Sequence, residues 1–337
     1  MSYQWFIGID VSKQTLDITI LNNSEKRMYE QIVNSDQSIK SFLKKLVNVQ
    51  KISLPDCLFC LEHTGIYNTY FLKVIEEKRL AVCVESSVHI KQSGGLLRGK
   101  NDKVDSYRIA LYAFKNKEFL TLWQPERAVI RHLRRLTGIR ERLLNAKKQI
   151  VNAVKEDQAF IHKNSSAQMI RCCKQSVKAL QEDIKRTEEE IKKVIDCDEK
   201  LKELFSIIES VPGVGKITAT EIVINTNEFK KINDPRKYAC YAGVAPFEHS
   251  SGTSVRGKTR TSKKANLKAK SLLHMTSLVA VRFSEDIRQY YERKVAEGKN
   301  KMNVLNAVKN KIIHRIFACV NQKRLYDKNY KFCLVES

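Results

Sequence analysis

Hydrophobic and polar residues follow a strand-like and then a helix-like rhythm over the first hundred or so positions. Residues 5–11 (WFIGIDV) form an almost wholly apolar run, and residues 16–20 (LDITI) place Leu16, Ile18 and Ile20 on one face of a strand. The same periodicities predict, in chain order, a strand at 28–33, a helix at 36–49 opened by Ser35 or Asp36, a strand at 57–62, a helix at 67–78, a strand at 80–85 and a helix that begins near Asp102.

Three strands followed by alternating helix and strand are the element order of an RNase H-like (RuvC-like) α/β domain, and residues 1–122 are assigned to it. Cys57 and Cys60 lie in the predicted strand at 57–62 with a spacing found in zinc sites. No second pair of ligands follows at a zinc-site spacing, so buried free thiols are the simpler interpretation.

A helical periodicity dominates the next stretch. Residues 126–208 contain one glycine, Gly138, no proline and many charged residues, with apolar residues recurring at helical spacing. A polar break around residues 162–166 divides the stretch. We therefore expect a long antiparallel helical hairpin, with arms near 126–160 and 167–208. Residues 123–208 are assigned to a coiled-coil region through which two chains dimerise.

The remainder, residues 209–337, predicts a mainly helical C-terminal domain. The segment SVPGVGKITA predicts a helix-hairpin-helix element, in which Gly213 and Gly215 allow a tight turn and the following helix directs its first N–H groups at a phosphate. A plain turn between two helices is the alternative. A later helix, at 268–282, is expected to bury Leu267, Leu272, Leu273 and Leu278.

The charge of the chain indicates what kind of partner it binds more clearly than its hydropathy does. The 337 residues include 61 Lys and Arg against 37 Asp and Glu, and no acidic residue occurs from His249 to Ser284. Such an excess favours a polyanionic partner, above all nucleic acid. No apolar run is long enough for a transmembrane helix, and the first residues lack a secretory signal, so we expect a cytoplasmic protein that acts without a membrane.

Four acidic residues are placed where phosphodiester chemistry needs them. Asp10 ends the first predicted strand, Glu62 ends the fourth, and Asp102 and Asp105 share one face of the helix near 102. The first and fourth strands are neighbours in an RNase H-like sheet. Such chemistry uses two Mg²⁺ ions about 3.5–4 Å apart, which carboxylate oxygens bind. We expect a two-ion Mg²⁺ site in which Mn²⁺ can substitute, although each acid alone also fits a turn or a helix cap.

The segments GIDVSK, LEHTGIY and KNDKVDS resemble the three motifs of the insertion-sequence 110 family of transposases. SVPGVGKITA and YAGVAPFEHSSGTSVRGKTRTSKKAN resemble that family's C-terminal domain, so the resemblance spans nearly the whole chain. Small departures occur at Asn101, where Thr is usual, at Ser106, where Ala is usual, and at Ala265, where Gly is common. The resemblance implies a four-acid RuvC-like catalytic domain and a C-terminal transposase domain.

The resemblance also implies a serine nucleophile from a Ser-Gly pair, which here is Ser251-Gly252. The hydroxyl would attack a scissile phosphate and form a covalent phosphoserine. From the residues alone Ser251 also fits a turn serine, and Ser250 is the adjacent alternative. His249 is a candidate proton acceptor.

The implied partners are donor DNA, target DNA and a structured guide RNA of the bridge type, and the resemblance suggests homodimers that pair into a tetramer in the synaptic complex. The expected location is the bacterial cytoplasm, in association with the nucleoid. The expected nucleic-acid contacts are Lys13, Lys100, Gly213, Gly215, Lys216, Arg256, Lys258, Arg260, Lys263 and Lys264.

Three other functions remain open. A Piv-type DNA invertase shares the same motifs and would differ in the DNA that flanks the gene. A RuvC-like nuclease needs the four acids but not Ser251. A nucleic-acid-binding protein without catalysis is disfavoured by the intact acids.

Overall fold

A computed structural model describes residues 3–23, 27–93, 101–160, 163–251, 255–261 and 265–327, of which the strands at 246–251 and 255–261 are described mainly by their backbone. The chain divides into two compact units, Met1–Pro125 and Glu126–Ser337. Each unit has its own hydrophobic core.

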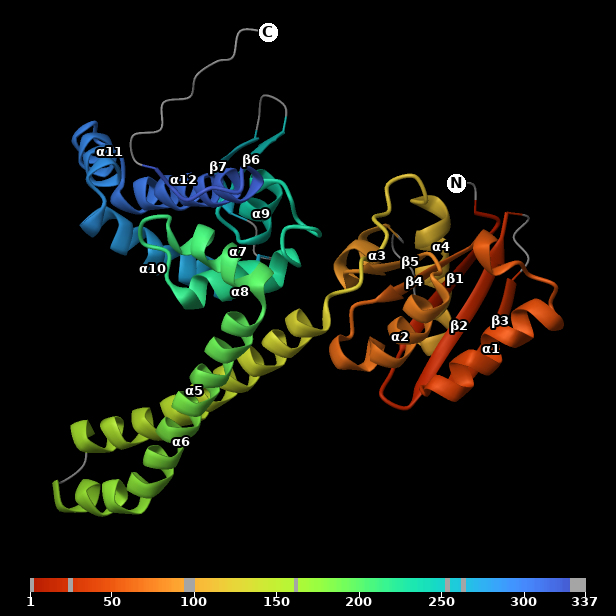
Figure 1. Cartoon of the computed structure of the whole chain (residues 1–337), viewed down its shortest axis with the longest axis horizontal. Coiled ribbons are helices and arrows are strands. Elements are labelled where there is room, and N and C mark those ends of the chain that lie inside the picture. Colours follow the sequence, from red (N-terminus) through yellow and green to blue (C-terminus); the bar gives the residue numbers. More distant parts are fainter. Residues whose placement is uncertain are drawn as a thin grey trace, which may run out of the picture. The chain divides into compact units, whose positions relative to one another are not determined.

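The first unit is built on one mixed five-stranded sheet of order β3-β2-β1-β4-β5 (Figure 1). β2 runs antiparallel to both of its neighbours, β1 and β3, whereas β4 runs parallel to β1 and β5 parallel to β4. This is the arrangement expected of an RNase H-like domain. The strands are β1 Trp5–Val11, β2 Thr15–Asn22, β3 Arg27–Val33, β4 Cys57–Glu62 and β5 Val82–Glu85.

Helices cover both faces of this sheet. The odd-numbered residues of β1 pack with α1 and α2, and the even-numbered ones with α3 and α4. Ser35 caps α1 by accepting from the Ser38 N–H, as the sequence predicts, whereas α3 was not predicted. The helices are α1 Asp36–Asn48, α2 Thr69–Lys78, α3 Ser87–Ser93 and α4 Asp102–Lys115, with short 3₁₀ turns η1 Leu54–Asp56 and η2 Gly65–Asn68.

The cysteines of this unit are interior side chains. Cys57, Cys60 and Cys83 are buried and unbridged. Burial raises the pKa of the Cys57 thiol, and that of Cys83, to about 12, so both stay protonated. Their packing in the sheet accounts for the CxxC spacing.

The second unit begins with two long helices that run side by side in opposite directions, α5 Ala128–Phe160 and α6 Lys163–Cys197 (Figure 1). The second arm is shorter than the sequence predicts. Asp198 takes an extended conformation and its carboxylate accepts from the Leu201 N–H, which starts the separate helix α7 Glu199–Glu209. A cap of this kind ends one helix and begins the next.

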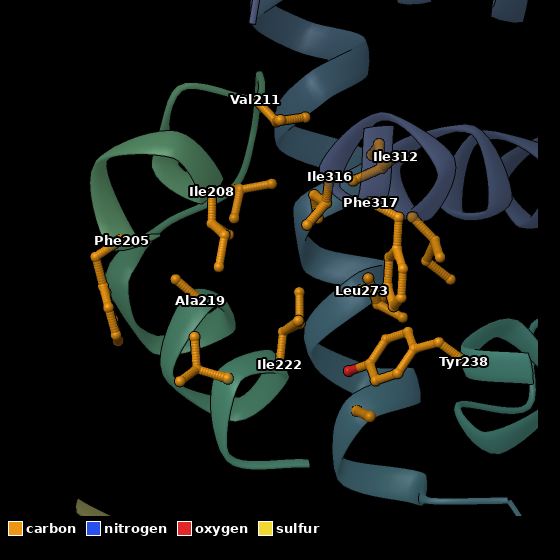
Figure 2. Packing of buried hydrophobic residues seen from close by; sticks show 14 of the residues in the cluster. Phe205, Ile208, Val211, Ala219, Ile222, Tyr238, Leu273, Ile312, Ile316 and Phe317 are labelled. Atoms are coloured by element: carbon orange, nitrogen blue, oxygen red, sulfur yellow. The ribbon is translucent and has the colours of Figure 1, made fainter. Parts of the chain in front are cut away.

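The rest of the second unit packs around a single core, part of which Figure 2 shows. Phe205, Ile222, Tyr238 and Phe317 lie in this core, and so do Ile130 and Ile195 from the base of the long hairpin. The hairpin base is therefore continuous with the C-terminal core. The elements are α8 Lys216–Thr226, α9 Pro235–Tyr241, β6 Pro246–Ser251, β7 Val255–Thr261, α10 Leu267–Phe283, α11 Glu285–Ala296 and α12 Lys301–Asn321.

The expected inward face of α10 is wrong in part. Leu273 is buried, but Leu267 is 71% exposed and Leu278 is 41% exposed. Small side chains form the buried face instead: Ala269, Thr276, Ser277 and Ala280. They allow neighbouring helices and the turn before α8 to approach closely, which leucines there would prevent. Over the described ranges, none of the helices combines the length and apolar character that crossing a bilayer requires.

Candidate active site

Two of the four predicted acids lie side by side where two neighbouring inner strands of the sheet end. β1 and β4 are parallel neighbours whose pairing runs up to Ile9 and Leu61, so Asp10 and Glu62 follow side by side. Both continue the rows of side chains that face α4, because Phe6 on β1 and Leu58 on β4 belong to the core beneath that helix. The end of the sheet therefore presents two carboxylates to α4.

The other two acids come from the first turn of α4. Asn101 caps this helix by accepting from the Val104 N–H at 2.8 Å, so Asp102 is the first helical residue and not the cap. Asn performs at this position the capping that Thr would perform. Asp105 lies one turn further on and pairs with Arg108 at 2.8 Å.

Close packing of α4 against β1 brings these residues toward Asp10. A Cβ atom on Gly8 would lie 2.1 Å from the Ala110 nitrogen and 2.3 Å from the Ser106 carbonyl oxygen, so no other residue fits here without movement of α4. A hydrogen bond of 2.8 Å between the buried hydroxyls of Thr19 and Ser106 joins β2 to the same helix.

The electrostatics of Asp10 show that the four acids share one neighbourhood. Partial burial first, and then the charges of Asp105, Asp102 and Glu62 in that order, together raise the pKa of Asp10 to about 6. Like charges gathered in this way are unfavourable unless a cation offsets them. An all-carboxylate donor set also matches the oxygen preference of a hard divalent ion.

The side chains do not yet converge on one point. In the part of the chain that the structure describes, no three Asp, Glu, His or Cys side chains are arranged to hold a metal ion as they stand. The structure thus brings the four acids near one another, and a bound ion would have to draw the carboxylates closer together.

Two buried asparagines, which the sequence analysis did not identify, donate hydrogen bonds that fix the loops at this end of the sheet. The side-chain amide of Asn34 donates to the carbonyl oxygens of Ser12 and Tyr67, at 2.9 and 3.1 Å, and so joins the segments after β1 and β4. The amide of Asn68 donates to the Glu62 carbonyl at 3.0 Å. Their signal in the sequence is faint, because Asn is also common in loops.

A further acid was also missed. Asp17 lies on β2 directly opposite Asp10 and is 2% exposed. Its charge contributes, after the causes above, to the raised pKa of Asp10. The only sequence signal was an acidic residue within the apolar strand LDITI.

The predicted nucleophile lies on the second unit. Ser251 is the last residue of β6, and its backbone pairs with Val255 of β7. In the same two-stranded ladder Arg256 pairs with Ser250 and Arg260 with Phe247, with an irregularity in register between Phe247 and His249. Gly252, Lys263, Lys264 and Lys100 lie outside the described residues, as do the side chains of Ser251, Arg256, Lys258 and Arg260.

Two helices joined by a tight turn occupy the predicted helix-hairpin-helix segment. Gly213 has φ +84°, and a Cβ there would lie 2.5 Å from the Thr276 carbonyl oxygen of α10. Gly215 precedes the first residue of α8, the exposed Lys216. Lys13 is likewise exposed, in the turn between β1 and β2. The geometry suits a phosphate contact, which stays a prediction.

Two family models match this chain. One, described as a transposase and named for the DEDD acids of IS110, matches residues 7–157, and another, the transposase IS116/IS110/IS902 family, matches residues 205–292. The pilin gene-inverting protein of Moraxella bovis is 21% identical over 96% of this chain and 98% of its own length. The IS116 uncharacterized 44.8 kDa protein of Streptomyces clavuligerus is 26% identical over 40% of this chain and 35% of its own length.

Among solved structures, T. thermophilus RuvC in complex with a Holliday junction substrate covers 36% of this chain and all of its own, at 11% identity and a TM-score of 0.29. The two family models together match well over half of the chain, at the segments that carry the four acids and the helices after them. The chain belongs to the IS110 family of transposases and is a DNA-acting enzyme of the transposase and recombinase class.

Proposed function

We propose that this enzyme cleaves and exchanges strands between donor and target DNA in a Mg²⁺-dependent reaction that passes through a phosphoserine at Ser251. The observation that supports it most directly is that the ends of β1 and β4 and the first turn of α4 bring Asp10, Glu62, Asp102 and Asp105 together, so that the other three charges raise the pKa of Asp10. Asp10, Glu62, Asp102 and Asp105 would hold the ions, two per site, with Mn²⁺ able to substitute. When bound, Mg²⁺ would offset the charge that accumulates on the phosphate during the displacement.

The protein's own groups would then perform a transesterification. The Ser251 Oγ attacks phosphorus, the bond from phosphorus to the 3′ oxygen breaks, and the serine proton is lost while the departing 3′ oxygen gains one. In the second step a 3′-OH of the other duplex attacks the phosphoserine and releases the serine. Each step forms one phosphoester bond and breaks one, so no external energy source is needed.

Basic residues around the serine would hold the DNA backbone. Arg256, Lys258, Arg260, Lys263 and Lys264 follow Ser251 within thirteen residues, and the release of counterions favours their binding to phosphates. Gly213, Gly215 and Lys216 would contact a phosphate without reading bases, in the manner of a helix-hairpin-helix element. Lys13 and Lys100 would contribute near the acids.

The experiment for the covalent step uses a nicked DNA substrate that traps the intermediate. Wild-type protein should give a protein–DNA adduct that survives denaturation, and Ser251→Ala should give none. Ser250→Ala, the adjacent hydroxyl, is the matched control and should still give the adduct. An adduct that persists in Ser251→Ala would refute the assignment, and strand exchange without any adduct would favour direct attack by a 3′-OH.

We also propose that a structured RNA encoded beside the gene selects the DNA sites. The support is the excess of positive charge together with the family, since the chain carries no recognisable base-reading module. The protein should be purified from cells that contain the whole element, and the RNA that accompanies it should be sequenced. One discrete species that maps beside the gene is the expected result, and its consistent absence would contradict the proposal.

Self-association through the long hairpin is a further part of this proposal. Ile139, Leu144 and Ile170 on α5 and α6 are each more than one-third exposed, which leaves apolar surface that a second copy can cover. Dimers that pair into a tetramer would supply the active sites that two duplexes require. Light scattering that finds only monomers at micromolar concentration, with and without nucleic acid, would argue against it.

The invertase is a second candidate. It is favoured by the alignment of the Moraxella bovis pilin gene-inverting protein with almost the whole chain. The same acids and serine would act on sites within one DNA molecule. DNA flanking the gene distinguishes the two: ends of an insertion sequence support the transposase, and an invertible segment supports the invertase.

A further inference from the structure

Asp17 places a buried negative charge beside the four-acid cluster. In the antiparallel pairing of β1 and β2, Asp17 lies directly opposite Asp10, so both side chains are on the sheet face that packs against α4. Directly opposed side chains have Cβ atoms about 4.5–5.5 Å apart, and like charges in that position destabilise a sheet. An acid that is 2% exposed in such a place requires compensation.

The compensation comes from the outer strand β3. The Tyr29 hydroxyl donates to Asp17 Oδ1 at 2.5 Å, and the Gln31 side-chain amide donates to Oδ1 and Oδ2 at 3.0 and 3.3 Å. The hydrogen bond to Asp17 is the main cause that raises the pKa of Tyr29 to about 12, so the tyrosine remains a donor. Both carboxylate oxygens are thus occupied, and Asp17 is held as an acceptor that points at β3.

The same tyrosine reaches the helix that carries two of the acids. The Lys103 ammonium lies over the Tyr29 ring, 5.0 Å from its centre, and Lys103 is next to Asp102 in the first turn of α4. A cation in this position is attracted by the ring. Asp17, Tyr29 and Lys103 therefore connect the sheet to the start of α4 across the face where the four acids gather.

We propose that Asp17 is a positioning residue of the catalytic centre: its fixed charge strengthens the binding of a divalent cation by the neighbouring carboxylates without itself becoming a ligand. The inference rests on the proposed metal site. Its basis is that Asp17 is buried opposite Asp10 while its oxygens are taken by Tyr29 and Gln31. A charge a few ångström from a divalent ion interacts strongly even at an effective dielectric constant of about 20.

The test measures metal binding apart from activity, by thermal unfolding of the full-length protein during a titration with Mn²⁺ or Mg²⁺. Asp17→Asn keeps the size and an acceptor oxygen but removes the charge. Its half-saturating metal concentration should rise about tenfold, equivalent to about 1.4 kcal/mol. Asp17→Thr, whose branched side chain suits a strand, should show the same loss and serves if the first variant does not fold.

Asp56→Asn is the matched control, because it removes the same charge at the opposite end of β4 from Glu62. It should titrate like wild type. In EDTA, Asp17→Asn should unfold at the same temperature as wild type or higher, because a like charge beside Asp10 is gone. If Asp17 were only a structural hydrogen-bond acceptor, the variant would instead unfold at a lower temperature and its half-saturating metal concentration would equal that of wild type.

Asp10→Asn distinguishes a failure of the role proposed for Asp17 from a failure of the metal site itself. If it loses stabilisation by metal while Asp17→Asn titrates like wild type, the role of Asp17 is wrong and the metal site stands. If Asp10→Asn itself titrates like wild type, the metal site that underlies the proposed function is wrong.

Discussion

Gly8 of β1 lies directly beneath Ala110 of α4, with the position of a Gly8 Cβ only 2.1 Å from the Ala110 nitrogen. Backbone here packs on backbone, and the nearest atoms cannot rotate away as the end of a side chain could. The distance between this strand and this helix is consequently set by the absence of one methyl group, two residues before Asp10.

Replacing Gly8 with Ala should push α4 away from β1. We expect a loss of about 3 kcal/mol in the free energy of unfolding, at the upper end for an overpacked core, together with a large loss of strand-transfer activity because Asp102 and Asp105 move with the helix. Denaturant unfolding and a strand-transfer assay measure the two effects. Gly138→Ala in α5 is the control: no atom lies within 4 Å of its Cβ position, and Ala should stabilise the helix by up to about 1 kcal/mol.

Asp10→Asn should stabilise the metal-free protein while it abolishes activity. Folding raises the pKa of Asp10 from 3.8 to about 6, so between these values the folded state binds more protons than the unfolded state. The free energy of unfolding contributed by this group therefore falls as the pH rises from about 4 to 6 and stays low above that range. Asn carries no charge at any of these pH values, so the variant does not lose this stability as the pH rises.

The expected difference between Asp10→Asn and wild type in EDTA is close to zero at pH 4 and about 1–2 kcal/mol at pH 7, discounted because the carboxyl is only partly buried. Saturating Mg²⁺ should stabilise wild type but not the variant, and so reduce the difference between their free energies of unfolding. A variant less stable than wild type at pH 7 in EDTA would show that the four acids do not repel one another.

The hydroxyl pair of Thr19 and Ser106 should behave as a unit. Both are fully buried and 2.8 Å apart, so Ser106→Ala takes one partner from Thr19 and should cost about 1–2 kcal/mol. Adding Thr19→Val to that variant removes both polar groups and should recover most of the loss. Chemical denaturation of the two single variants and the double variant completes the cycle, and strictly additive losses would contradict the coupling.

Arg127 should matter more to the second unit than other arginines of the long hairpin. Its guanidinium donates to both oxygens of Asp198 and both of Glu228, and thus joins the chain before α5, the cap of α7 and the end of α8. Arg127→Met removes the arginine from Asp198 and leaves Glu228 with only its longer pair to Lys230, and it should cost about 3 kcal/mol of the free energy of unfolding. Arg186→Met removes an exposed pair with Asp183 at 3.8 Å and should cost well under about 1 kcal/mol. Equal losses in thermal unfolding would remove the special role of Arg127.

The sequence predicted those parts of the fold that depend on local periodicity. The five strands followed from apolar runs. The neighbouring positions of Asp10 and Glu62 followed because each acid lies at the end of its strand and the two strands are adjacent in the expected sheet. The break at Asp198 was missed although its capping hydrogen bond, from the Leu201 N–H, is local; the carboxylate is in addition bound by Arg127, which is 71 residues away and which no local pattern reveals. The buried face of α10 was misjudged because close helix packing selects Ala280 over leucine, and Asp17 because β3 supplies its partners.

The position of Ser251 at the last paired residue of β6 makes the proposed chemistry sensitive to length as well as to composition. The register of β6 against β7 is already irregular between Phe247 and His249, and each residue deleted between Pro246 and Ser251 would shift the backbone of Ser251 along the ladder by about 3.4 Å. On the proposed mechanism, substitutions within β6 should therefore be tolerated better than insertions or deletions in it.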